Sequence, residues 1–229
     1  MDPSKIPFNA LIVGPTNSGK SRFVVDQPYG PFHAKFDYIV LICPTFTHKK
    51  TYHRLGENDP RMDVIVCEQH DVETWLKLVR WLSEGTNTLI ILDHCTPSKD
   101  VKGRTGELVN LAFSAWDMGI SMWALTRKLT GITASFCENV AAIVLFYTPS
   151  ARTTKAIFDD YAGELSPDEY RGLISKLKER KFSYLMFALH HPYGVKLFEK
   201  KCELHITLHN LCRRHLRCYE PYGNGACGV

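Results

Sequence analysis

The sequence lacks a long hydrophobic run, a strong excess of charge of one sign and a signal-peptide pattern. The longest apolar run after the first strand, residues 140–147, is far too short to span a bilayer. A net charge of +4 with an isoelectric point near 8.6 permits an anionic partner, but it excludes the dense charge of a protein that coats nucleic acid. We therefore expect a soluble protein of a reducing intracellular compartment, the nucleus or the cytoplasm.

Disulfide-rich secreted folds are not favoured either, although the chain contains eight cysteines. Cys43, Cys67 and Cys95 fall within or at the ends of expected core strands, where a free thiol behaves as a small hydrophobic side chain. With 229 residues and 45% hydrophobic composition, the chain can bury the core of one α/β domain. We assign residues 1–198 to this domain and residues 199–229 to a divergent C-terminal tail.

A glycine-rich loop is the most informative motif, because it fits G-x-x-x-x-G-K-[ST] at every fixed position. It follows the apolar run 9–13, which predicts a buried strand, and it leads into residues 22–26, which can begin a helix. In such a loop, successive backbone N–H groups turn inward around a phosphate chain. We expect nucleotide contacts from the whole loop, which consists of Gly14, Pro15, Thr16, Asn17, Ser18, Gly19, Lys20 and Ser21.

The last two residues of the loop and a distant aspartate complete the expected site for ATP and magnesium. Lys20 would reach the β- and γ-phosphates, and the Ser21 hydroxyl would hold Mg²⁺. The apolar run 88–93 predicts a strand that ends in the carboxylate of Asp93. A carboxylate at this position can accept from water on Mg²⁺ or from Ser21, so Asp93 is both a metal-site and a catalytic candidate.

Strands and helices alternate along the rest of the chain. Strands are expected at residues 36–43, 63–67, 120–126 and 141–147, and helices at 72–84, 106–118, 149–161 and 167–181. A hairpin is expected from residues 182–189 and 194–198. Around a phosphate loop, this order predicts a mostly parallel sheet with helices on both faces. We expect the tryptophans of residues 72–84 to lie in the core rather than to form a base-stacking surface.

Two polar segments are candidates for contact with DNA. Residues 45–60 are expected to form a long exposed loop or a short helix, with the basic side chains His48, Lys49, Lys50 and Arg54. A second polar loop carries Lys99, Lys102 and Arg104. A solvated basic loop has the same composition and is the simpler interpretation of each segment.

The C-terminal tail contains Cys202, His205, His209, Cys212, His215, Cys218 and Cys227, which suggests a zinc site. If residues 202–218 are helical, the first four of these side chains share one stripe, but they spread over about 15 Å. One zinc ion with bonds of about 2.0–2.3 Å cannot collect four ligands from a straight helix of that length. A disordered or loosely packed helical extension is therefore the favoured interpretation.

The chain contains, in order, GPTNSGKSRFVVDQ, FDYIVLICPTF, NTLIILDHC, SKDVKGRTGELVNLAFSA, GISMWALTRKLT, ENVAAIVLFYTPSARTTKAIF, DDYAGELS and LKERKFSYLMFALHHPYG. This set resembles the FtsK–HerA-type DNA-packaging ATPases over about residues 8–198, with the nearest similarity to those of Maverick/Polinton elements and large DNA viruses. The resemblance implies a RecA-like core that assembles as a ring, usually hexameric. It also implies that ATP hydrolysis is used to translocate double-stranded DNA, and that in this branch of the family the DNA is moved into a capsid.

Several catalytic positions of that family are substituted here. The second acidic residue that normally follows Asp93 is His94, which can orient water only when it is neutral. The resemblance places an arginine finger in the family's Arg-His pair, where this chain has Trp116-Asp117, and the family's γ-phosphate-sensing Gln is Arg127. The family's Phe-Arg-Glu-Asn is residues 136–139, with Cys137 in the place of the arginine.

Three functions remain open from the sequence. The first is an ATP-driven DNA translocase, in which His94 and Arg127 act as replacement catalytic groups. The second is a nucleotide-binding protein that has lost turnover, since an arginine finger alone can be worth about 10³ to 10⁵ in rate. The third is a small-molecule kinase, which ranks last because the sequence lacks an arginine-rich lid that would shield a transferring phosphoryl group.

Overall fold

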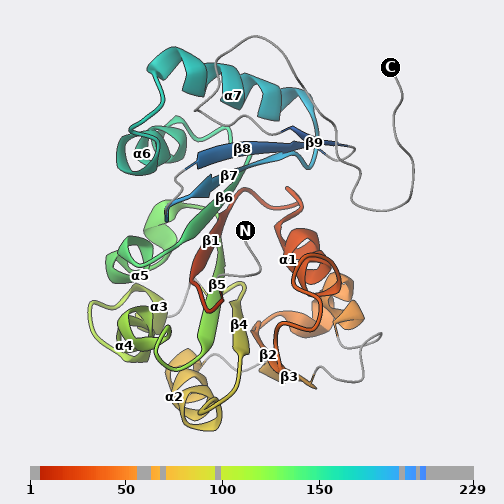
Figure 1. Cartoon of the computed structure of the whole chain (residues 1–229), viewed down its shortest axis with the longest axis vertical. Coiled ribbons are helices and arrows are strands. Elements are labelled where there is room, and N and C mark those ends of the chain that lie inside the picture. Colours follow the sequence, from red (N-terminus) through yellow and green to blue (C-terminus); the bar gives the residue numbers. More distant parts are fainter. Residues whose placement is uncertain are drawn as a thin grey trace.

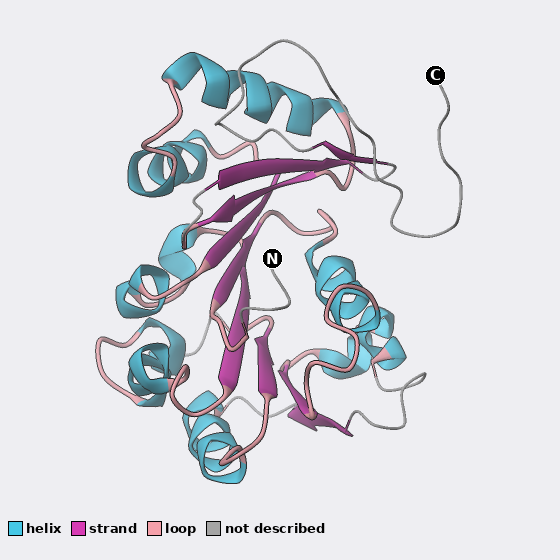
Figure 2. Cartoon of the chain, in the orientation of Figure 1, coloured by secondary structure: helices cyan, strands magenta, loops and turns pink. Residues whose placement is uncertain are grey.

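The computed structural model describes residues 6–55, 63–67, 71–95, 99–190, 194–199 and 202–204. Within these residues the chain forms one nine-stranded sheet with the strand order β3-β2-β4-β5-β1-β6-β7-β8-β9 (Figures 1 and 2). The strands are β1 (Ala10–Val13), β2 (Tyr38–Ile42), β3 (Asp63–Cys67), β4 (Thr88–Leu92), β5 (Ile120–Thr126), β6 (Ala142–Phe146), β7 (Tyr184–Ala188), β8 (Gly194–Glu199) and β9 (Cys202–Leu204). The expected α/β class is confirmed.

The six strands from β3 to β6 are parallel, and the hairpin beyond β6 is antiparallel. The central strands β1, β4 and β5 are buried along their whole length, as expected for parallel strands that are covered on both faces. Their C-terminal ends lie at one edge, where Val13 is in register with Thr126 of β5 and Leu145 of β6. The loop after β1 therefore begins in the middle of the sheet.

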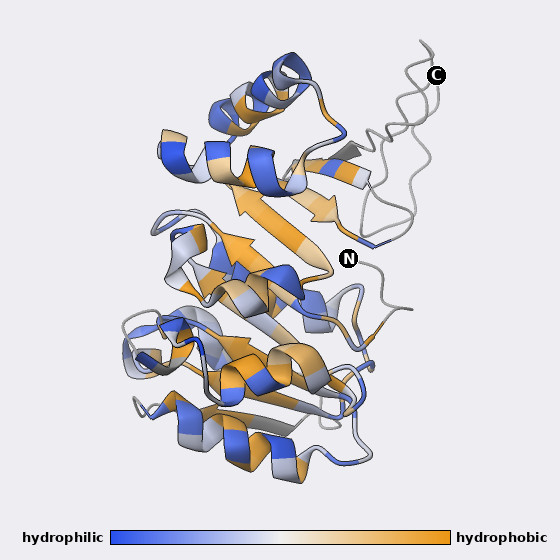
Figure 3. Ribbon diagram, turned by 90° about the vertical axis from the view of Figure 1, so that its left-hand side faces the viewer, coloured by the Kyte–Doolittle hydropathy of each residue, from blue (hydrophilic) through white to orange (hydrophobic). Residues whose placement is uncertain are grey.

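Helices cover both faces of the sheet (Figure 1). On one face lie α1 (Lys20–Tyr29) and the 3₁₀ helices η1 (Phe46–His48) and η2 (Lys50–Arg54). On the other lie α2 (Val72–Leu82), α3 (Lys99–Lys102), α4 (Glu107–Ser114), α5 (Ala134–Glu138), α6 (Ala151–Tyr161) and α7 (Pro167–Glu179), and the 3₁₀ helix η3 (Leu129–Gly131) follows β5. Hydrophobic residues concentrate in the strands of the sheet (Figure 3). Together with the buried residues of the helices they form two core clusters, one on each face of the sheet.

Local sequence signals determine where the longer helices begin. Ser166 and Glu169 form a capping box at the start of α7, and Pro167 occupies its first turn. Asp71 caps α2 and Ser150 caps α6 through their side chains. These starts agree with the sequence expectations to within two residues.

The expectations about burial are met only in part. Residues 46–54 include the short helices η1 and η2, and a short helix was one of the two expectations for this segment, but the segment is not simply exposed, because Tyr52 of η2 is 1% exposed and Leu55 is also buried against the core. In α2, Trp75 packs partly buried against the core as expected, but Trp81 is 76% exposed. Residues six positions apart point in directions about 120° apart around a helix, so Trp81 is turned away from the side of Trp75.

The sheet continues into the residues assigned to the tail. Residues 202–204 form β9, which pairs antiparallel with β8, so they are not part of a helix as considered for the tail. The other tail cysteines and histidines lie outside the described residues.

The short helices α3 and α5 were not expected, since four- and five-residue segments give little periodicity.

A bilayer-spanning segment needs a helix that combines sufficient length with apolar composition, and the described residues contain none.

Asn9, immediately before β1, links three segments through its buried side chain. Its Oδ1 accepts from the backbone N–H of Met122 at 3.2 Å. Its Nδ2 donates to the carbonyls of Ala112 and Asn139, each at 3.4 Å. This amide therefore fixes the start of β1, and with it the phosphate loop, against β5 and the helices α4 and α5.

We expect Asn9→Ala to lower the free energy of unfolding by about 1–3 kcal/mol, because it leaves buried backbone groups without partners. Urea unfolding followed by circular dichroism measures the change. Asn87→Ala is the control, since Asn87 is exposed, and it should change stability by less than about 0.5 kcal/mol. Equal stability of the two variants would contradict the structural role of Asn9.

Candidate functional site

The glycine-rich loop leaves β1 at Gly14, whose N–H donates to the carbonyl of Thr126 at 3.1 Å. A Cβ atom at Gly14 would lie 2.7 Å from Ser18 Oγ and 2.8 Å from Phe146 Cβ, so a larger residue does not fit. Gly19 has φ of 105°, which side-chain-bearing residues rarely adopt. The two glycines of the motif are thus required by a close approach and by a left-handed backbone, respectively.

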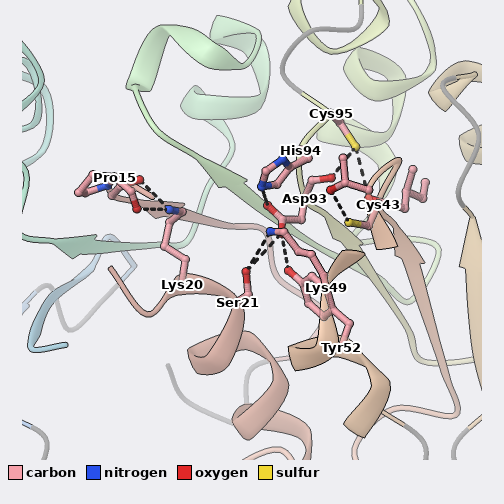
Figure 4. A network of polar contacts seen from close by, with 12 residues as sticks. Pro15, Lys20, Ser21, Cys43, Lys49, Tyr52, Asp93, His94 and Cys95 are labelled. Atoms are coloured by element: carbon pink, nitrogen blue, oxygen red, sulfur yellow. Dashed lines mark hydrogen bonds and ion pairs between the residues drawn. The ribbon is translucent and has the colours of Figure 1, made fainter. Parts of the chain in front are cut away.

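Lys20 is folded back onto its own loop. Its Nζ donates to the carbonyl oxygens of Gly14 and Pro15, both at 2.7 Å (Figure 4). Burial is the main cause that lowers the pKa of the Lys20 ammonium to about 8; nearby Lys49 and Arg127 lower it further, and Asp93 opposes them. The ammonium is still mostly protonated at neutral pH, and it is held where the loop would surround phosphate oxygens.

Asp93 follows β4 and is 3% exposed. Its Oδ2 atom accepts from three side chains: Lys49 Nζ at 2.6 Å, Tyr52 Oη at 2.7 Å and Ser21 Oγ at 3.3 Å (Figure 4). The short distance from Ser21 to Asp93 is the pairing expected from the sequence. Tyr52 remains a donor because burial, reinforced by Asp93, raises the pKa of its hydroxyl well above the ordinary value.

Lys49 and Tyr52 were not expected to take part in this site. Lys49 joins η1 to η2, and the backbone N–H of Tyr52 in η2 donates to the carbonyl of Lys49 at 3.0 Å, which holds the two residues near each other. A signal was present in the sequence, because the segment follows β2, and the carboxyl ends of parallel strands meet at one edge. The composition of residues 45–60 indicated solvent exposure instead, and so hid their role.

His94 and Arg127 are brought to the same region by the ends of β4 and β5. His94 has φ of 59°, and its Nε2 lies 3.9 Å from Asp93 Oδ1. Burial is the main cause that lowers the pKa of His94 below its ordinary value, which favours the neutral imidazole. Arg127 is exposed and faces the cavity described next.

A cavity of about 490 Å³ lies over the loop, a volume suited to a nucleotide-sized ligand. It is lined by Thr16, Asn17, Ser18, Gly19, Lys20, Ser21, Arg22, Lys49, Thr51, Asp93, His94, Leu125, Thr126, Arg127 and Phe182. The buried Ser18 hydroxyl has no hydrogen-bond partner among the described residues. Most of the site residues predicted from the sequence thus line one cavity, whereas Gly14 and Pro15 are not among its lining residues.

The residues present fit a magnesium ion by their donor chemistry. Mg²⁺ prefers oxygen ligands such as hydroxyls and carboxylates, and Ser21 Oγ and Asp93 Oδ2 lie 3.3 Å apart. A positively charged group already bridges the two, since Lys49 Nζ is 3.4 Å from Ser21 Oγ and 2.6 Å from Asp93 Oδ2. This pair of oxygens therefore attracts a cation.

Two of the substituted family positions do not line the cavity. Trp116 lies beyond the end of α4 and is 56% exposed. Cys137 lies in α5, is 8% exposed and belongs to the core. An arginine at position 137 would be buried in this fold, whereas an arginine at position 116 would reach solvent.

A glycine-rich loop after a central parallel strand, with a buried carboxylate at the end of β4, is the arrangement of a RecA-like α/β fold. Solved structures of this fold support the assignment. No family profile matches the chain, nor does the sequence of any curated protein.

Similar solved structures include the genome-packaging NTPase B204 from Sulfolobus turreted icosahedral virus 2 in complex with AMP. That structure has a TM-score of 0.66 and 16% identity over 87% of this chain and 98% of B204. B204, the DNA-packaging ATPase from Sulfolobus turreted icosahedral virus, gives a TM-score of 0.64 and 17% identity, with the same coverage. The pCW3 conjugation coupling protein TcpA gives 0.51 and 14% identity over 82% of this chain and 59% of TcpA. At these identities the likeness establishes the fold, and the RecA-like core expected from the resemblance is confirmed.

We expect Tyr52→Phe to lower the free energy of unfolding by about 1.5–3 kcal/mol, the range for hydrogen bonds to charged groups. Removing the hydroxyl takes one of three donors from a buried carboxylate. Urea unfolding measures the loss, with Tyr38→Phe as the matched control, because Tyr38 is only partly buried and its hydroxyl donates no hydrogen bond within the described residues. An unchanged Tyr52→Phe variant would show that the contact is not formed in solution.

Cys137 should resist alkylation in the folded protein. Burial raises the pKa of its thiol to about 11, so only about 0.1% is thiolate at pH 8. Iodoacetamide labelling followed by peptide mass spectrometry should modify this cysteine in urea and leave it unmodified in buffer. Rapid labelling in buffer would contradict the burial of α5 against the core.

Proposed function

We propose that this protein is an ATP-binding P-loop ATPase that translocates double-stranded DNA, as a packaging motor does. The main supporting observation is the cavity that joins the glycine-rich loop, Lys20 and Ser21 to the buried carboxylate of Asp93. The fold shared with B204, which is described as a DNA-packaging ATPase, supports the same proposal. The proposal also includes assembly into a ring and a link to Maverick/Polinton and viral elements. These two parts rest on the sequence resemblance.

The loop residues would bind the phosphates of ATP. Lys20 would exchange its two loop carbonyls for β- and γ-phosphate oxygens, which carry full negative charge and make stronger hydrogen bonds. Ser21 and Asp93 would hold Mg²⁺, which when bound neutralises charge on the phosphates. The Ser18 hydroxyl, unpaired among the described residues, is a further donor in the same loop.

His94 and Arg127 are the proposed catalytic groups beside Asp93. A neutral imidazole can accept a proton from water and orient it, and the pKa of His94 is lowered from its ordinary value mainly by burial. Arg127 would place a fixed positive charge at the phosphates, where negative charge develops during transfer. Trp116 cannot supply such a charge to a neighbouring subunit.

DNA contacts are proposed for the basic side chains that face solvent. Lys50, Lys99, Lys102 and Arg104 are exposed. Lys49 is removed from the DNA-facing set considered from the sequence, because its ammonium is bound to Asp93. Backbone phosphates would be the targets of such groups, so binding should weaken with salt.

Lys20→Ala should weaken ATP binding by about 10- to 100-fold, because it removes a charge-assisted contact to phosphate. Wild-type protein should hydrolyse ATP faster than Lys20→Ala, and double-stranded DNA should increase the rate. Steady-state phosphate release and a nucleotide titration on the full chain measure both effects. Lys35→Ala removes an exposed lysine outside the cavity and serves as the control.

The outcomes separate the alternative functions. If DNA does not change the rate of hydrolysis, the protein is an ATPase but the proposed DNA translocation is excluded. Binding without hydrolysis would favour loss of turnover, and the variant His94→Asp, Trp116→Arg, Arg127→Gln should then restore it. Cys137→Arg is left out of that variant, since position 137 is buried. Transfer of phosphate to a small acceptor would instead indicate a kinase.

A further inference from the structure

Lys49 lies at the position where the proposed site would hold its metal ion. Its Nζ is 2.6 Å from Asp93 Oδ2 and 3.4 Å from Ser21 Oγ, and these are the two oxygens suited to Mg²⁺ (Figure 4). Mg²⁺ binds oxygen at about 2.0–2.1 Å. A metal ion bound to the same two oxygens would lie in contact with the Lys49 ammonium. Overlap and charge repulsion therefore prevent the two cations from binding there together.

The fold, rather than chance, places this lysine. Lys49 joins η1 to η2, and its backbone N–H donates to the carbonyl of Phe46 at 2.7 Å. Tyr52 and Leu55 are buried and anchor the segment against α1 and the sheet. The Lys49 side chain is 22% exposed, and its ammonium lies 5.6 Å from the centre of the Tyr52 ring. The segment thus presents one cation to the buried carboxylate.

Charge balance explains why a cation is needed there. Asp93 is 3% exposed, and a buried carboxylate without a positive partner is costly. The lysine of the loop does not serve this purpose, because Lys20 Nζ is bound to the carbonyls of Gly14 and Pro15. Among the described residues, the ion-pair partner that contacts Asp93 closely is Lys49, at 2.6 Å, whereas His94 is 3.9 Å away.

We propose that Lys49 acts as a built-in cation that competes with Mg²⁺ for Ser21 and Asp93, and so sets the metal dependence of nucleotide binding. This rests on the proposed nucleotide site in the same cavity. ATP binds to the loop with the ammonium of Lys49 in place of the metal, and Mg²⁺ adds little affinity. Lys49 is a specificity-determining residue for the cofactor, and Mg²⁺ enters only when its side chain withdraws toward solvent.

The first test measures metal binding without nucleotide. Mn²⁺ takes the same oxygen ligands as Mg²⁺ and is detected by electron paramagnetic resonance. Lys49→Met keeps an unbranched side chain, one atom shorter than lysine, and removes its charge, so it should bind Mn²⁺ at least about tenfold more tightly than wild type. Lys35→Met, at an exposed lysine outside the cavity, should bind as wild type does. Equal Mn²⁺ affinity in wild type and Lys49→Met overturns the proposal.

The second test measures nucleotide binding by calorimetry, using a non-hydrolysable ATP analogue with excess EDTA or excess Mg²⁺. Wild-type affinity should differ by less than about threefold between the two conditions, and that of Lys49→Met by more than about tenfold, because coupling between two ligands is reciprocal. A wild-type protein that requires Mg²⁺ for binding overturns the proposal.

Two further outcomes keep the tests decisive. If Lys49→Met does not fold, Lys49→Gln retains a neutral donor to Asp93 and should show the same gain in Mn²⁺ affinity. If the wild type binds no nucleotide under either condition, the proposed function fails. The Mn²⁺ titration still decides the role of Lys49 in that case, so failure of the function and failure of the inference are distinguishable.

Discussion

The buried carboxylate of Asp93 is the constraint on which the site depends. It lies at the end of β4, away from water, and therefore requires donors and positive charge from other parts of the chain. Those donors come from α1 through Ser21 and from the η1–η2 segment through Lys49 and Tyr52. One carboxylate thus ties together three segments that are distant in sequence, and it defines one wall of the cavity.

The order of the strands explains the shape of that cavity. β5 lies between β1 and β4, so the loop must pass over the end of β5 before Ser21 can reach Asp93. The end of β5 consequently forms part of the cavity wall and brings Arg127 to it. Because neighbouring strands are about 4.8 Å apart, the ends of β1 and β4 are separated by about 10 Å. The space above the end of β5, between these two strand ends, is large enough for a phosphate chain and a cation.

Both lysines of the site are occupied by protein oxygens in this structure. Lys20 is bound by loop carbonyls and Lys49 by Asp93, so a phosphate ligand of the loop would have to replace the carbonyl contacts of Lys20. The positions that differ from the pattern of packaging ATPases fall into two groups by their place in the fold. His94 and Arg127 border the cavity, whereas Trp116 and Cys137 lie away from it. The decisive question for function is therefore local to the ends of β4 and β5.

The sequence by itself determined the glycine-rich loop, the buried parallel strands and the place of Asp93, because backbone sterics and hydrophobic periodicity act over a few residues. It could not determine which of several polar residues turn inward. Lys49 and Tyr52 contact Asp93 because the strand order brings together residues that are more than forty positions apart along the chain. Trp81 faces solvent because of the rotation of α2 against the sheet, and β9 extends the sheet through pairing with β8. Only the tertiary structure decided these contacts, since a buried charge selects its partner in space and not in sequence.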